Sequence, residues 1–423
     1  MKRYDSYKDS GIKWLGEIPS HWEIRRTKYL WKETDSRSEY GSEQLLSVSQ
    51  YDGVREAQSD SRSESLKGYK IVQQEDLVIN IMLAWLGGLG VSKYKGIVSP
   101  AYCVYKLIDV QNPRYLHYLY RTPLYLADFA RHSTGIVPSR WRMYTDNFGE
   151  VLTLLPPIEE QSRMVEYLDE ATSKIDEAIA QQQKMIDLLN ERKKIIINNA
   201  VTKGLDYNVK MKPSGVDWIG DINQSWYLFK LKYLLKKALM YGANESAESD
   251  DPSWPRYIRI TDIDEDGNLR PDTFKSLTKT KADPYLLSRG DVLFARSGAT
   301  AGKTYLFDED IKACFAGYLI KASLNERLLP KYLIYYTKSG VYDNWKNGIF
   351  IQATIPNIGA EKYANLLIPL PSINVQRDII NYLDVEIGKI NTVIGGCKHK
   401  ISLLQERRQI IINDVVTGKV KVV

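Results

Sequence analysis

Leu188–Asn198 reads LLNERKKIIIN and Leu403–Asn413 reads LLQERRQIIIN, so one stretch of this chain occurs twice, 215 residues apart. A second repeat has an offset of 204 residues: GIKWLGEI from Gly11 returns as GVDWIGDI from Gly215. Self-similarity of this kind indicates a tandem duplication. Its two halves share their ends and differ by 11 residues in the stretch between those ends.

Each copy of the first block lies in a region with the pattern of one long helix. Proline-containing breaks at 155–157 and 370–372 precede the two regions, and Gly204 and Gly418 follow them. Proline is common at the start of a helix and glycine just after its end. Apolar residues recur in alternating steps of four and three, the spacing of a coiled-coil seam. A helix of about 40 residues is a rod of roughly 60 Å and needs its apolar stripe covered, so we expect each helix to cover the other. The seam positions are Leu168, Thr172, Ile175, Ile179, Gln182, Ile186, Leu189 and Ile196 in the first helix, and Leu383, Ile387, Ile390, Ile394, Cys397, Ile401, Leu404 and Ile411 in the second.

The segments in front of the two helices have the pattern of mixed α/β domains. Leu45–Ser49 and Tyr257–Thr261 are strand-like. Comparison by eye aligns Glu75–Ile79 with Arg289–Leu293, and elsewhere the two segments differ widely. A duplicated frame that carries two unlike domains favours one scaffold with two readers of different targets. The expected divisions are residues 1–157, 158–206, 207–372 and 373–423.

Composition limits the class of protein. The 423 residues are 43% hydrophobic and 26% charged, which is globular, and a net charge of +6 is compatible with a polyanionic partner. Three scattered cysteines and four histidines show no metal-ligand spacing, which favours a reducing, metal-free interior. The N-terminus has no signal-peptide pattern, and the apolar run Val78–Val91 is too short to span a bilayer. We therefore expect a cytoplasmic protein.

The order of several short motifs resembles that of Type I restriction-modification specificity subunits along nearly the whole chain. The motifs are GIKWLGEIPSHW at 11–22, LPPIEEQ at 155–161, GDVLFARSG at 290–298 and the duplicated helix. Each motif alone is weak, and together they are specific.

The resemblance implies two target-recognition domains, each reading half of a split DNA sequence, separated by two long helices that form an antiparallel coiled coil. It also implies a subunit without catalytic activity. Its partners would be double-stranded DNA, two methyltransferase subunits and two restriction or motor subunits. S-adenosylmethionine, ATP and Mg²⁺ would bind to those partners, and no cofactor or metal site is expected in this chain.

Base reading requires side chains that bond base edges, and Lys and Arg contacts to phosphate set the register. The first domain offers such groups on an early strand and a late loop, and the second domain offers them in three segments. The candidates in the first domain are Ser47, Ser49, Gln50, Arg140 and Arg142. Those in the second are Arg259, Thr261, Asp262, Arg296, Ser297, Thr300, Lys303, Gln352 and Thr354.

Structural alternatives remain open for several of these residues. Arg259 and Asp262 could form a surface ion pair, and 297–302 could be a polar turn. Tyrosines at helical spacing, namely Tyr115, Tyr118 and Tyr125, favour core packing over nucleic-acid contact.

Two rival functions also remain. One is a DNA methyltransferase or nuclease with degenerate motifs: Ser99–Tyr102 lacks the second proline of a methyltransferase tetrad, and Asp272 with Asp310 and Lys312 could imitate the carboxylate-lysine set of a nuclease. Binding of S-adenosylmethionine by the purified chain would identify that rival. The other is a coiled-coil scaffold without a DNA role, which predicts no salt-sensitive DNA binding. Separately, residues 297–304 approach an ATP-binding P-loop but lack one of its glycines.

Overall fold

The computed structural model describes residues 2–51, 53–57, 65–137, 140–206, 208–264, 267–350 and 356–422. Packing contacts divide the chain into two units. Unit 1 comprises Met1–Gln182 and Lys398–Val423, and unit 2 comprises Gln183–Cys397. Each unit thus contains one mixed α/β segment and half of each long helix.

The two long helices are α4 (Ile158–Thr202) and α9 (Ile373–Val416). They begin directly after the proline-containing breaks, as the sequence predicts. Gly204 and Gly418, which follow the two helices, have φ of +89° and +74°. Only glycine adopts this left-handed conformation at little cost, so it suits the residue that ends a helix.

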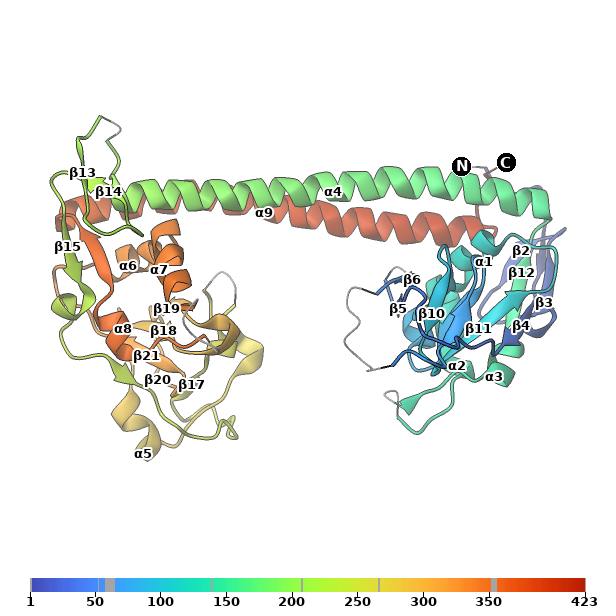
Figure 1. Ribbon diagram of the computed structural model, residues 1–423, viewed down its shortest axis with the longest axis horizontal. Coiled ribbons are helices and arrows are strands. Elements are labelled where there is room, and N and C mark those ends of the chain that lie inside the picture. Colours follow the sequence, from blue (N-terminus) through green and yellow to red (C-terminus); the bar gives the residue numbers. More distant parts are fainter. Residues whose placement is uncertain are drawn as a thin grey trace. The chain divides into compact units, whose positions relative to one another are not determined.

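The halves of α4 and α9 that share a unit run antiparallel and side by side (Figure 1). In unit 1, Arg408 Nε lies 3.1 Å from Asp176 Oδ1. In unit 2, the equivalent positions are Lys193 and Asn391, and the lysine donates to the amide oxygen at 3.0 Å. The predicted seam positions are buried or half-buried. The predicted fold class, two mixed α/β domains with an antiparallel pair of long helices, is confirmed.

Unit 1 is built on a four-stranded antiparallel sheet in the order β4-β11-β8-β9. The pairs β1-β2, β3-β12, β5-β6 and β7-β10 surround it. Its strands are β1 (Tyr7–Asp9), β2 (Glu17–Pro19), β3 (Glu23–Arg26), β4 (Trp31–Thr34), β5 (Leu46–Ser49), β6 (Gly53–Glu56), β7 (Lys70–Val72), β8 (Leu77–Asn80), β9 (Leu89–Val91), β10 (Gly96–Val98), β11 (Tyr102–Leu107) and β12 (Leu152–Leu155), and its short helices are α1 (Pro113–Tyr120), α2 (Pro123–His132) and α3 (Thr145–Gly149).

Unit 2 repeats this plan with the sheet β16-β21-β18-β19. The pairs β13-β14 and β15-β22 correspond to β1-β2 and β3-β12. Its strands are β13 (Met211–Pro213), β14 (Asp221–Asn223), β15 (Tyr227–Lys230), β16 (Met240–Tyr241), β17 (Arg256–Ile258), β18 (Val292–Ala295), β19 (Thr304–Leu306), β20 (Ala313–Phe315), β21 (Leu319–Ala322) and β22 (Leu367–Leu370), and its short helices are α5 (Lys279–Ala282), α6 (Pro330–Tyr336), α7 (Gly340–Phe350) and α8 (Ala360–Ala364).

One sequence alignment between the halves is wrong by a single residue. The alignment of Glu75–Ile79 with Arg289–Leu293 does not match the turns that precede β8 and β18. In both turns an aspartate, Asp76 or Asp291, accepts a hydrogen bond from the backbone N–H three residues earlier, at 2.7 and 2.8 Å. The two aspartates are therefore equivalent, at an offset of 215 residues. The sequence does not reveal this equivalence because the residue before each aspartate is Glu in one turn and Gly in the other, although both have positive φ.

One predicted strand is shorter than expected. The run Tyr257–Thr261 was expected to continue as a strand, but β17 ends at Ile258. A short 3-10 turn follows because the Asp262 carboxylate accepts from both the backbone N–H and the guanidinium of Arg259. The expected strand at Leu45–Ser49 is confirmed as β5.

The shared N-terminal motif of each half packs on the end of a long helix in its own unit. Trp22 is fully buried and Trp226 nearly so. A Cβ at Gly418 would lie 2.5 Å from Pro19 and 3.0 Å from the Trp22 ring, and one at Gly204 would lie 3.2 Å from the Trp226 ring. In each unit the duplicated motif thus packs against the C-terminal end of a long helix, α9 in unit 1 and α4 in unit 2.

Candidate nucleic-acid interface

A groove in unit 2 opens at one end of the four-stranded sheet, where β16 and β18 end and β21 begins. Its volume is about 520 Å³. We call it the Arg296 groove. Arg296 and Ser297 are among the sequence-predicted candidates, whereas the other four side chains were not predicted. The side chains that line it are those of Tyr241, Asn244, Arg296, Ser297, Tyr318 and Asn357.

Arg296 is held in this groove from several sides. Its guanidinium carbon lies 5.2 Å from the centre of the Tyr241 ring, and its Nε donates to Asn357 Oδ1 at 3.4 Å. The Tyr241 hydroxyl in turn accepts a hydrogen bond from the backbone N–H of Ala360 at 2.9 Å. Backbone bonds to Tyr318 and Ile358 fix the arginine main chain. The side chain is therefore positioned before any ligand arrives.

Two glycines, Gly242 and Gly317, let two backbone segments cross in close contact at the bottom of the groove. A Cβ at Gly242 would lie 2.3 Å from the backbone oxygens of Phe315 and Ala316, closer than any real side chain permits. The backbone N–H of Gly317 donates to the oxygen of Ala243 at 2.7 Å. The two segments thus cross with their backbones in contact, which leaves the polar side chains around them accessible.

Thr300 and Lys303 belong to the polar turn that follows Arg296 and do not line the groove. Gly298–Thr300 form one 3-10 turn, and β19 begins at Thr304. A P-loop continues into a helix at this place, whereas here a strand pairs back onto β18. Residues 297–304 therefore do not form a P-loop, as the missing glycine indicates, and the polar-turn alternative is the structure observed.

Arg259 and Asp262 form the ion pair that the sequence left open. The guanidinium Nη2 lies 2.6 Å from Asp262 Oδ1 and 2.8 Å from the backbone oxygen of Thr273. The carboxylate is buried, so this pair holds the turn after β17. Thr261 is exposed on the same turn. Contact of these three residues with DNA stays a prediction, and the remaining candidates Gln352 and Thr354 lie outside the described residues.

The same end of the sheet in unit 1 presents different side chains. The backbone N–H of Met143 donates to the oxygen of Ile81 at 2.9 Å. In unit 2 the equivalent bond, at 2.8 Å, joins Ile358 to Arg296. Ile81 of unit 1 therefore occupies the place that Arg296 has in unit 2. The strand register in each unit then shows which neighbouring residues are equivalent. The equivalent pairs are Ile81 and Arg296, Arg142 and Asn357, Asp35 and Tyr241, and Ala101 and Tyr318.

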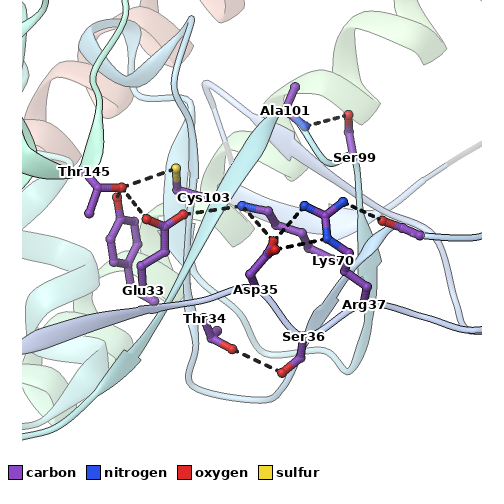
Figure 2. Close-up of polar contacts among 12 residues, drawn as sticks. Glu33, Thr34, Asp35, Ser36, Arg37, Lys70, Ser99, Ala101, Cys103 and Thr145 are labelled. Atoms are coloured by element: carbon purple, nitrogen blue, oxygen red, sulfur yellow. Dashed lines mark hydrogen bonds and ion pairs between the residues drawn. The ribbon is translucent and has the colours of Figure 1, made fainter.

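An ionic network occupies this end of unit 1 (Figure 2). Arg37 donates to both oxygens of Asp35, at 2.9 and 3.1 Å, and holds the pKa of that carboxyl below its usual range. The buried ammonium of Lys70 lies 3.4 Å from Glu33 and 3.7 Å from Asp35. Burial and the nearby Glu33 raise the pKa of the Cys103 thiol. This cysteine therefore lacks the lowered pKa that marks a nucleophile.

The early candidates of unit 1 lie on the β5-β6 hairpin. The Oγ atoms of Ser47 and Ser49 accept hydrogen bonds within the hairpin, from Arg55 and Tyr51. Gln50 is exposed at its tip. Arg121 fastens this tip by donating to the backbone oxygens of Gln50 and Tyr51, at 3.1 and 2.5 Å. The exposed side chain of Gln50 is thus presented on an anchored loop.

The late candidates of unit 1 lie on the loop that leads to α3. Arg140 is exposed. Arg142 forms a backbone bridge with Thr134, and its guanidinium donates to the oxygen of Trp141 at 2.8 Å. Arg142 also stands at the place of Asn357, and its contact with DNA stays a prediction.

The tyrosines at helical spacing pack inside unit 1, as predicted. Tyr115 and Tyr125 are fully buried and Tyr118 half-buried, where it donates to Asp169 at 2.7 Å. The cysteines are free. Within the described part of the chain, no three His, Cys, Asp or Glu side chains lie together as a metal site would need. A helix with the length and apolarity to cross a membrane is likewise absent from the described residues.

Comparison with known proteins points to one family. Residues 223–395 match the model of the Type I restriction modification DNA specificity domain. The chain is 24% identical over 287 residues to the Type I restriction enzyme MjaVIII specificity subunit of Methanocaldococcus jannaschii, covering 65% of this chain and 63% of that one. It is 23% identical over 289 residues to the Type I restriction enzyme EcoBI specificity subunit of Escherichia coli, covering 66% and 60%. The matched regions thus span less than two thirds of these relatives.

The fold also has a counterpart among solved structures. A chain from a study of complex assembly and conformational transition of the type I R-M system superimposes with a TM-score of 0.67 and 16% identity, covering 95% of this chain and 99% of that one. At this identity the likeness concerns the fold alone. The resemblance seen in the short sequence motifs is confirmed by the matched domain and the named relatives. Over residues 223–395 the chain is thus similar to the DNA specificity domain of Type I restriction-modification systems, and over about two thirds of its length to specificity subunits of such enzymes.

Proposed function

We propose that the chain is the DNA sequence-specificity subunit of a Type I restriction-modification complex and binds a bipartite, asymmetric site through its two α/β domains. One observation carries this proposal: the two units repeat their frame and differ at the sheet end. In the frame, Tyr118 donates to Asp169 and the equivalent Tyr335 donates to Asp384. At the sheet end, Arg296 of unit 2 is replaced by an isoleucine in unit 1. One frame with two unlike polar surfaces suits the reading of two unlike half-sites.

The long helices offer a surface for the proposed partners. Leu403 and Ile410 on α9, in unit 1, are 50% and 51% exposed. Their equivalents on α4, Leu188 and Ile195 in unit 2, are 56% and 57% exposed. Leucine and isoleucine seven residues apart form a stripe that an amphipathic helix can cover. We call these pairs the outer stripes. Two copies of one stripe suit two copies of one partner, the methyltransferase subunit, with two restriction subunits joining the complex.

Catalysis in this proposal belongs to the partners, which would bind S-adenosylmethionine, ATP and Mg²⁺, and the complex would act in the cytoplasm. The surroundings of two side chains that could take part in catalysis, Cys103 and His117, suit a structural role. This supports a chain without activity of its own. Cys103 has a raised thiol pKa. The His117 ring accepts from the backbone N–H of Val91 through Nδ1, at 3.1 Å.

The test is the methylation pattern of the host genome. With partner subunits present, we expect a split methylated motif that disappears when the gene for this chain is deleted. Exchange of residues 20–150 for those of a relative should change one half of the motif only. An unchanged pattern after deletion, or a change in both halves after the exchange, would contradict the proposal. Binding of S-adenosylmethionine by the purified chain would favour a methyltransferase instead.

A further inference from the structure

Arg296 has donors that the structure leaves available. Its backbone, its Nε and the face of its guanidinium are all engaged, as described above. Among the residues that the structure describes, none accepts a hydrogen bond from its two terminal nitrogens. An arginine whose plane is fixed while its terminal fork is available loses little side-chain entropy when it binds a planar acceptor pair.

The chemistry of the groove favours a base edge over a phosphate. Arg296 is the one charged side chain among the described residues that line it. Two amides, Asn244 and Asn357, and the Tyr318 hydroxyl supply both donors and acceptors beside it. Phosphate oxygens only accept hydrogen bonds, whereas base edges in the major groove present donors as well as acceptors, so the acceptor oxygens beside Arg296 favour a base edge.

We infer that Arg296 reads a guanine in the half-site bound by unit 2, its two terminal nitrogens donating to O6 and N7 in the major groove. Paired donors at this spacing match guanine and no other base edge in that groove. The inference rests on the proposed function. Tyr241 is a positioning residue in it, since its ring faces the guanidinium and its hydroxyl is anchored on Ala360. Unit 1 carries isoleucine at the equivalent position, so this guanine belongs to one half-site.

The experiment selects binding sites from a library of randomised DNA duplexes, using the full-length chain in complex with its methyltransferase subunits. We expect wild type to enrich a split motif with at least one guanine in the half-site of unit 2. Arg296→Ala should lose the preference for guanine at one position by roughly 5- to 100-fold. The other half-site should be unchanged. Tyr241→Ala should weaken the same preference by a smaller factor.

Arg296→Lys separates base reading from phosphate binding, because lysine keeps the charge and loses the planar fork. We expect it to lose the guanine preference as Arg296→Ala does. The matched control is Arg289→Ala: Arg289 lies near the other end of the same strand and pairs with Asp308 on the surface. It should enrich the wild-type motif.

Two results would overturn the inference while leaving the proposed function intact. One is an unchanged motif for Arg296→Ala. The other is equal weakening of all sequences by Arg296→Ala with full rescue by Arg296→Lys, which is the behaviour of a phosphate contact. Failure of the wild-type complex to enrich any motif would instead overturn the proposed function, and this inference with it.

Discussion

The hydroxyl of Tyr115 donates a hydrogen bond to the backbone oxygen of Val416 at 3.2 Å, across 301 residues of sequence. The last four carbonyls of a helix have no partner within it, and here a buried phenol from α1 supplies one for α9. Unit 2 repeats the arrangement, since Tyr332 donates to Val201 in the last turn of α4 at 3.3 Å. In each unit the α/β domain is thereby joined to the end of a long helix by a buried hydrogen bond.

Removal of this hydroxyl should destabilise unit 1. Tyr115→Phe leaves the buried oxygens of Leu154 and Val416 without this donor, which should cost about 1–3 kcal/mol of unfolding free energy. Urea denaturation followed by tryptophan fluorescence measures it. Tyr29→Phe is the control, because the Tyr29 side chain is 60% exposed, and it should change stability by less than about 0.5 kcal/mol. Equal stability of the two variants would disprove the role of this bond.

The glycine that ends α9 should tolerate no side chain. Gly418→Ala combines a left-handed backbone with a Cβ 2.5 Å from Pro19. The left-handed backbone alone costs about 1–2 kcal/mol of unfolding free energy, and we expect the variant to lose more than that. Gly16→Ala isolates the backbone cost, because Gly16 has φ of +73° and open space around it. Thermal melting of both variants gives the comparison. A melting temperature for Gly418→Ala no lower than that for Gly16→Ala would contradict the packing argument.

The outer stripes should each bind one methyltransferase subunit. Replacement of Leu403 and Ile410 by glutamate puts charge on surface side chains that unit 1 does not bury, so the melting temperature of the free chain should stay within a few degrees of wild type. Native mass spectrometry of the complex should then find one methyltransferase subunit where wild type has two. The same change at Leu188 and Ile195 should remove the other. Two bound subunits in either variant would place the contact elsewhere.

His117 should stay neutral in mildly acidic solution. Burial and the charges of Arg121, Lys93 and Arg114 lower its pKa to about 3. The ordinary value is about 6.5, so between these two pH values the unfolded chain binds more protons than the folded one. The contribution to stability is therefore complete above pH 6.5 and is lost as the pH falls toward 3. NMR signals of the ring should not move between pH 7.5 and 5.

A variant separates this effect from other titrating groups. His117→Gln keeps an acceptor for the backbone N–H of Val91 and removes the titration. Below pH 6.5 the unfolding free energy of wild type should therefore fall more steeply than that of the variant. Parallel slopes, or a ring titration centred near pH 6.5, would show that the histidine is protonated in the folded state.

The sequence predicts the frame well because the frame is made of local signals. Proline breaks and terminal glycines mark the bounds of α4 and α9, and the heptad pattern predicts which face of each helix is buried. The Tyr257–Thr261 strand failed for the opposite reason: strand-like residues gave way to a turn that the Arg259–Asp262 pair stabilises. That pair depends on burial of the carboxylate, which no local pattern reveals.

The Arg296 groove illustrates the second limit of the sequence. Arg296 and Ser297 were found because they lie in a recognisable motif. Tyr241, Tyr318 and Asn357 come from three other segments, and only the pairing of β16 and β18 with β21 brings them together. The duplication itself held a usable signal. Alignment of the turns at Asp76 and Asp291 would have paired Arg296 with Ile81 and marked the position as divergent.

Lys2 and Lys421 pair as a backbone bridge in unit 1, with the N–H of Lys421 donating to the oxygen of Lys2 at 2.9 Å. By the offsets of the two repeats, both lysines correspond to one residue of unit 2, Asp206, where the chain runs unbroken from α4 toward β13. A hydrogen-bonded pair in unit 1 thus stands where unit 2 has a continuous backbone. Linking Lys421 to Lys2 by a peptide segment and cutting the chain near Asp206 should therefore leave the packing within each unit unchanged.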